Sequence, residues 1–118
     1  MANWVVGNTA DGVHLDVNEN SSTGNVSGTL TIAGVAYPVQ GNWTASGSVP
    51  GRNVSNLELR GAAPSPGAAG APNFVALSGQ ISFNGGNPNI SGIDAGVYMA
   101  SSNTGELLNT VTQLVPGQ

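Results

Sequence analysis

Short runs in which apolar and polar residues alternate recur along most of the chain. Val13, Leu15 and Val17 alternate with His14 and Asp16, which predicts a strand with one buried and one solvated face. Similar runs follow at residues 26–32, 35–39, 57–59, 77–83, 93–99 and 111–115. This period of two indicates strands throughout and predicts an all-β protein.

Turn-forming residues separate these runs, as at residues 10–12 and 33–34. No segment of helical length has apolar residues at helical spacing and is also free of Gly and Pro. At most, residues 106–109 form a turn of helix. Glycine also recurs inside the runs, for example at Gly28 and Gly79, where it permits the bending that a barrel requires. We therefore expect an antiparallel up-and-down meander of about eight strands forming a small barrel, with a two-sheet β-sandwich as the alternative.

The length of 118 residues predicts one domain over residues 1–118. Residues 61–73 break the alternation with a low-complexity stretch of Gly, Ala, Pro, Ser and Asn, and are expected to form a long loop. A mobile binding loop and a tolerated surface insertion are the two interpretations. The insertion is favoured, because Ala, Gly and Pro carry few groups that recognise a ligand.

Charge is scarce, with two basic and six acidic residues and a net charge of −4. The two arginines, Arg52 and Arg60, cannot make the basic patch that nucleic-acid binding requires. The chain has no cysteine, which excludes disulfides, thiol catalysis and thiolate metal sites. No apolar run approaches the ~20 residues of a membrane span.

The first seven residues lack the basic start and long apolar stretch of a secretory signal, so a cytoplasmic location is the default expectation. A mature secreted or surface protein with a new first Met would have the same sequence. No lysine guards the edges of the expected sheet, and a neutral, Val-rich outer face favours a homo-oligomer.

His14 is the one histidine, and the alternation places it on the same strand face as Asp16. Such a pair can do acid–base work, but without Cys, Lys or a distinctive Ser a hydrolytic triad has little support. An exposed strand histidine is the favoured interpretation. We therefore expect no enzymatic activity and no cofactor.

Residues 16–20, Asp-Val-Asn-Glu-Asn, imitate the start of a calcium-binding loop. Ser21 stands where the loop glycine belongs, and Ser27 stands where the bidentate glutamate belongs. A solvated turn is favoured over a weak calcium site formed by Asp16, Asn18 and Glu19. No metal site is expected.

Aromatic side chains supply the best candidates for ligand contact. Trp43 and Tyr37, with Asn42 beside Trp43, could stack on a sugar ring and bond its hydroxyls. The competing interpretation places such aromatics in the core or at an oligomer interface. The candidate ligand-binding residues are thus Trp43, Tyr37 and Asn42.

Two segments, Leu77-Ser-Gly-Gln-Ile81 and Val26-Ser-Gly-Thr-Leu30, resemble the avidin and streptavidin family. The resemblance implies an eight-stranded up-and-down barrel. Leu77 stands where the family's Trp-Ser-Gly-Gln motif has tryptophan, and the chain's two tryptophans are too few for a biotin cage, so no biotin site is implied.

Two functional hypotheses follow from the composition and the candidate residues. The first is a non-enzymatic binding or protein-interaction module, in which loops at one barrel end contact a partner protein. The alternative is a lectin-like carbohydrate-binding protein that uses Trp43, Tyr37 and nearby Asn residues.

Overall fold

The computed structural model describes residues 2–44, 54–62, 72–86, 89–101 and 107–118. Eight β-strands, and no helix, make up the regular structure of these residues. The strands are β1 (Ala2–Asn8), β2 (Val13–Glu19), β3 (Asn25–Ile32), β4 (Val35–Thr44), β5 (Val54–Ala62), β6 (Phe74–Phe83), β7 (Ile90–Ala100) and β8 (Leu107–Leu114).

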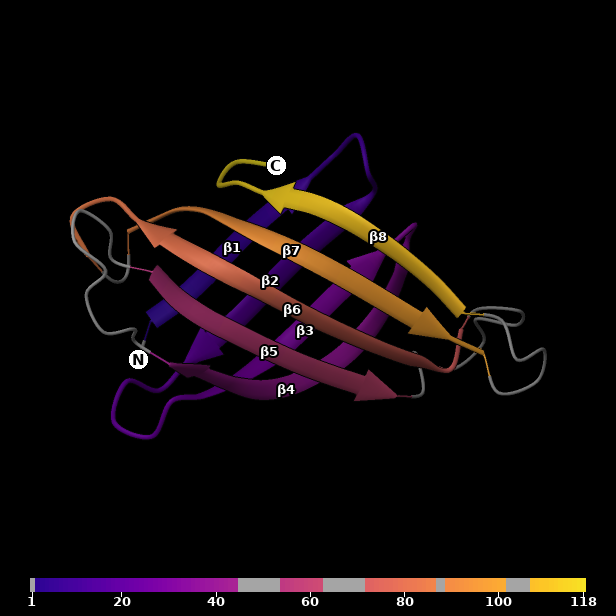
Figure 1. Cartoon of the computed structure of the whole chain (residues 1–118), viewed down its shortest axis with the longest axis horizontal. Helices are drawn as coiled ribbons and strands as arrows, with labels where there is room; N and C mark the ends of the chain where they lie inside the picture. Colours follow the sequence, from indigo (N-terminus) through magenta and orange to yellow (C-terminus); the bar gives the residue numbers. More distant parts are fainter. Residues whose placement is uncertain (1, 45–53, 63–71, 87–88, 102–106) are drawn as a thin grey trace.

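All eight strands belong to one antiparallel sheet in the order β1 to β8, so each strand pairs with its neighbours in sequence (Figure 1). The sheet curls into a nearly closed barrel. An isolated bridge joins Gly7 of β1 to Val115, just after β8, through two backbone hydrogen bonds of 2.9 and 2.8 Å. The predicted all-β meander and barrel are confirmed, and the sheet does not divide into a sandwich.

Apolar side chains from alternate strand positions fill the barrel interior. In β2 the inward residues Val13, Leu15 and Val17 are buried, whereas the intervening positions are partly or fully exposed. Each fully buried Leu, Ile or Val contributes about 2 kcal/mol. The remaining buried apolar residues are Trp4, Val6, Val26, Leu30, Ile32, Tyr37, Val39, Leu57, Leu59, Val75, Leu77, Ile81, Ile93, Ala95, Val97 and Leu114.

Glycine occupies inward positions where neighbouring strands approach too closely for a side chain. A Cβ at Gly41 would collide with the backbone carbonyl of Glu58 and lie 2.9 Å from the Leu59 Cα. A Cβ at Gly28 would likewise collide with the backbone of Asp16. These glycines let the strands coil tightly enough for the sheet to close.

The strand positions differ from the expectations at three places. Strand β1 lies before the first predicted run. Residues 107–109 begin β8 and do not form a helical turn, because they pair with β7. Strand β5 continues through Ala62, and residues 63–71 of the expected loop lie outside the described residues. Within the described ranges, no helix is long and apolar enough to cross a membrane.

Candidate functional site

The structure does not bring the three candidate ligand residues together. Tyr37 and Trp43 both point inward from β4, but they lie six residues apart, or roughly 20 Å along a strand. Asn42, next to Trp43 in β4, points outward. A single ligand inside the barrel therefore cannot contact Tyr37 and Asn42 together.

Tyr37 is a core residue with 1 % of its surface exposed. Its hydroxyl donates a hydrogen bond to the carbonyl oxygen of Pro72 at 3.0 Å. Burial raises the pKa of the Tyr37 hydroxyl above its usual value, because the charged form would lose its hydration. This environment supports a structural role for Tyr37 in linking β4 to the start of the β6 segment.

Trp43 belongs to an aromatic cluster that packs against one end of the core. Its ring meets the ring of Trp4 edge-to-face, with 5.3 Å between centroids, and both rings contact Phe83 at 6.1 Å. Such pairs contribute about 1 kcal/mol each beyond the area that they bury. Trp43 remains partly exposed, so one part of its ring is accessible from outside.

A buried carboxylate, Glu19, lies against this cluster. The Trp43 indole N–H donates to Glu19 Oε2 at 3.1 Å, and the backbone N–H of Ala2 donates to Oε1 at 3.0 Å. The Ser21 hydroxyl also lies within 3.0 Å of both oxygens. The expected solvated turn is therefore wrong at Glu19, whose side chain points inward with 1 % of its surface exposed.

The remaining polar candidates on β2 point outward. Asp16 Oδ1 accepts a hydrogen bond from Asn3 Nδ2 at 2.9 Å, and His14 Nδ1 lies 3.0 Å from the carbonyl oxygen of Gln118. Because Glu19 faces the interior, it cannot join Asp16 and Asn18 around one ion. Among the residues that the structure describes, no three His, Asp or Glu side chains gather as a metal site would require.

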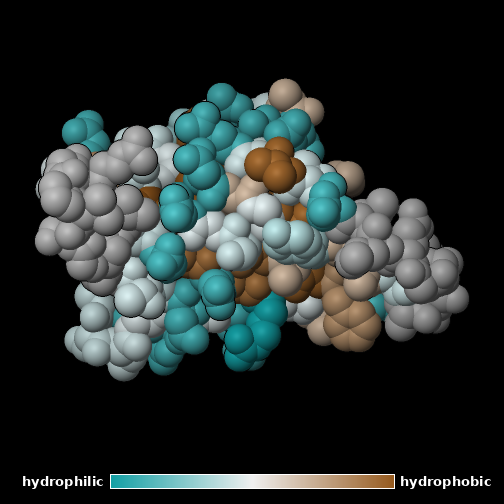
Figure 2. Space-filling view, in the orientation of Figure 1, coloured by the Kyte–Doolittle hydropathy of each residue, from teal (hydrophilic) through white to brown (hydrophobic). Residues whose placement is uncertain are grey.

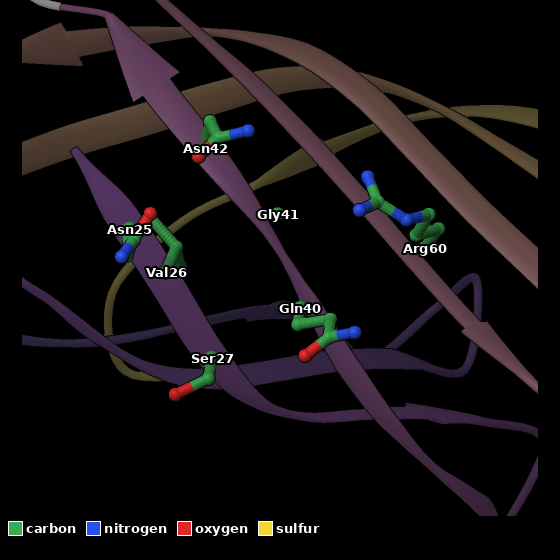
Figure 3. A pocket seen from close by; sticks show the side chains of 7 residues that line it. All are labelled: Asn25, Val26, Ser27, Gln40, Gly41, Asn42 and Arg60. Atoms are coloured by element: carbon green, nitrogen blue, oxygen red, sulfur yellow. The ribbon is translucent and has the colours of Figure 1, made fainter. Parts of the chain in front are cut away.

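Asn42 contributes to a shallow depression of about 390 Å³ on the outer wall of β3, β4 and β5 (Figure 3). Strand pairing sets Asn25 opposite Asn42 in one row, and Ser27, Gln40 and Arg60 side by side in the next. Four of these groups are neutral amides or hydroxyls. The depression thus offers several hydrogen-bond donors and acceptors around one guanidinium.

Gln40 and Arg60 also line two adjoining depressions. One extends over Pro38 and Ala62, and the other reaches Phe74, which is 50 % exposed. Arg60 is the single basic residue in the described ranges. A peptide crossing these depressions would meet a polar section, a guanidinium and an apolar section in turn.

On the other side of Arg60, Tyr98 forms an exposed aromatic platform. Tyr98 is 44 % exposed, and its ring lies over the backbone of Gly96, where a Cβ would meet the hydroxyl oxygen at 2.9 Å. Tyr98 shares a depression of about 310 Å³ with Glu58, Arg60 and Ser78. Figure 2 shows that the face in view is mainly hydrophilic or neutral, with small separate hydrophobic areas.

Sequence reasoning missed Gln40, Arg60, Asn25 and Ser27 as members of one surface. The alternation assigns each of them to the polar side of its strand, which is a usable signal. Their proximity depends on the pairing of three strands.

Comparison with protein-family models, curated proteins and solved structures finds no match for the chain.

Proposed function

We propose that the protein is a non-enzymatic interaction module that binds an extended acidic peptide segment of a partner protein on its outer wall. The supporting observation is the position of Gln40 and Arg60 at the junction of three adjoining depressions. The barrel interior is occupied by core side chains, so recognition takes place outside.

The chemistry of the junction fits a peptide with a carboxylate. The Arg60 guanidinium can donate two parallel hydrogen bonds to one carboxylate. The amides of Gln40, Asn25 and Asn42 can both donate to and accept from a peptide backbone. The exposed Phe74 ring provides an apolar contact next to the charged one.

The test is selection of a displayed library of short linear peptides on the immobilised protein, followed by calorimetric titration of the enriched peptides. Arg60→Gln is expected to weaken binding of acidic peptides at least about tenfold, because a charge-assisted hydrogen bond is lost. Gln80→Ala, an exposed amide on β6 outside the depression, serves as the matched control and should bind as wild type does. Equal binding by Arg60→Gln, or no enriched peptide, contradicts the proposal.

A carbohydrate ligand is the second candidate, supported by the exposed Tyr98 ring beside neutral polar groups. Sugars stack on such rings and bond to amides and hydroxyls. On a glycan array, binding by the wild type that is lost in Tyr98→Ala would favour this candidate over the peptide. Tyr98→Ala is a cleaner probe than Trp43→Ala, because Trp43 holds Glu19 and the aromatic cluster in place.

A further inference from the structure

Among the described residues, a single backbone bridge joins the two edge strands at the seam of the barrel. Strands β1 and β8 meet at the bridge between Gly7 and Val115, where Asn8 Nδ2 also donates to the carbonyl oxygen of Gln113 at 3.1 Å. From there the first part of β8 runs past the end of β1 at Asn8 and away from that strand, as Figure 1 shows. The edge of β8 from Leu107 to Val111 has no backbone hydrogen bond to β1 among the described residues.

The alternation of an antiparallel ladder shows which backbone groups face this edge. Val115 exchanges both of its hydrogen bonds with Gly7, so its N–H and C=O point away from β7. The β7–β8 register runs without irregularity from Leu114 back to Leu107. Because the direction reverses at each residue, the backbone groups of Asn109 and Val111 also point away from β7.

The composition of this edge favours pairing with another β-strand. Strand β8, Leu-Leu-Asn-Thr-Val-Thr-Gln-Leu, carries no charge and no proline, and proteins use both to guard exposed edges. Val111 is 86 % exposed on the outer face, and it lies opposite Gly96, which offers it no side chain to pack against. Figure 2 shows a separate hydrophobic area over the region of β8.

We propose that the β8 edge pairs with the β8 edge of a second copy of this chain, in antiparallel orientation about a two-fold axis. Such an edge is self-complementary, since each outward N–H of one strand meets an outward C=O of the other. Neither β8 carries a charge that would repel its copy, although each chain is acidic. The pairing also covers Val111 and joins two eight-stranded sheets into one. This inference is independent of the proposed peptide site.

The test combines sedimentation analysis of the wild type across a concentration series with amide hydrogen exchange. The expected result is a dimer of twice the 11.7 kDa chain mass, with the Asn109 and Val111 amides protected at high concentration. Val111→Lys should give a monomer whose other amides exchange as before. Asn109→Pro should do the same, because proline removes an edge-facing N–H and leaves the bonds to β7 intact.

Val5→Lys is the matched control, because Val5 is an exposed valine on the other edge strand, β1. It should remain dimeric. Loss of assembly in Val5→Lys, or growth of the wild type beyond a dimer, would show that β8 pairs with β1 and overturn the proposal. A monomeric wild type would also overturn the proposal, whether its Asn109 and Val111 amides exchange fast or slowly. So would a dimer that persists in both Val111→Lys and Asn109→Pro.

Discussion

Glu19 is the residue on which one end of the barrel depends. Its carboxylate accepts hydrogen bonds from the Trp43 indole and the Ala2 backbone, so removing it leaves two partly buried donors without their acceptor. We expect Glu19→Ala to lower the free energy of unfolding by about 3 kcal/mol and to alter tryptophan fluorescence, as measured by urea unfolding. Glu58→Ala, which removes an exposed carboxylate of β5, is the control and should change stability little. Equal stabilities of the two variants would contradict this role.

Tyr37 links stability to pH at the alkaline end. Burial raises the pKa of its hydroxyl in the folded protein above the value of 10.0 that applies when it is exposed. Folding therefore favours the protonated form. Ionisation of this group leaves the free energy of unfolding unchanged below about pH 10 and lowers it as the pH rises from there through the folded-state pKa.

Tyr37→Phe should remove this part of the alkaline decline and cost about 1 kcal/mol at neutral pH, because the hydrogen bond to Pro72 is lost. Urea unfolding at neutral and alkaline pH measures both effects. Tyr98→Phe, which alters an exposed tyrosine, is the control. A wild-type decline that persists unchanged in Tyr37→Phe contradicts the assignment.

At this scale the sequence predicts which side of a strand a residue occupies, but not what it meets there. Alternation from Val39 places Tyr37 and Trp43 on the inward side and Asn42 on the outward side, as observed. The same alternation, continued from Val17, places Glu19 on the inward side, but the partners of its buried carboxylate were not predictable. Two of its partners, Ala2 and Trp43, lie 17 and 24 residues away in the chain and become neighbours only through strand pairing.

At the scale of single strands, the inward glycines determine how tightly the sheet can curl. Gly41→Ala should lower the free energy of unfolding by about 3 kcal/mol, since the new methyl collides with the backbone of β5 and rigid backbone cannot give way. Gly92→Ala is the matched control within β7, where the nearest atom would be 3.3 Å away. Thermal or urea unfolding of both variants measures the difference. Equal losses would show that backbone entropy, and not the close approach, decides the cost.

The strands were predictable where the alternation is clean and less so elsewhere. Residues 26–30 and 77–81, where the alternation is regular, lie in β3 and β6 and place Gly28 and Gly79 inward. Strand β1 was missed because Val5 and Val6 are adjacent apolar residues, of which Val6 is buried and Val5 is 43 % exposed. An exposed valine breaks the pattern on which the prediction depends.

At the scale of the whole molecule, the seam is supported by the turn between β1 and β2. The Thr112 hydroxyl donates to Asp11 Oδ2 at 2.7 Å, which ties this turn to β8. Thr112→Val should cost about 1 kcal/mol and speed hydrogen exchange at the Gly7 and Val115 amides. Thr29→Val, on the exposed face of β3, is the control. Unchanged exchange at the seam in Thr112→Val would contradict this coupling.

The sequential order of the strands has a consequence for how the chain folds. Pairings between successive strands bring together residues that are close in sequence, whereas the bridge between Gly7 and Val115 joins the two ends of the chain. Closing that longest loop costs the most chain entropy, so hairpins form first and the seam closes last. Weakening the seam therefore accelerates unfolding and leaves the rate of folding nearly unchanged.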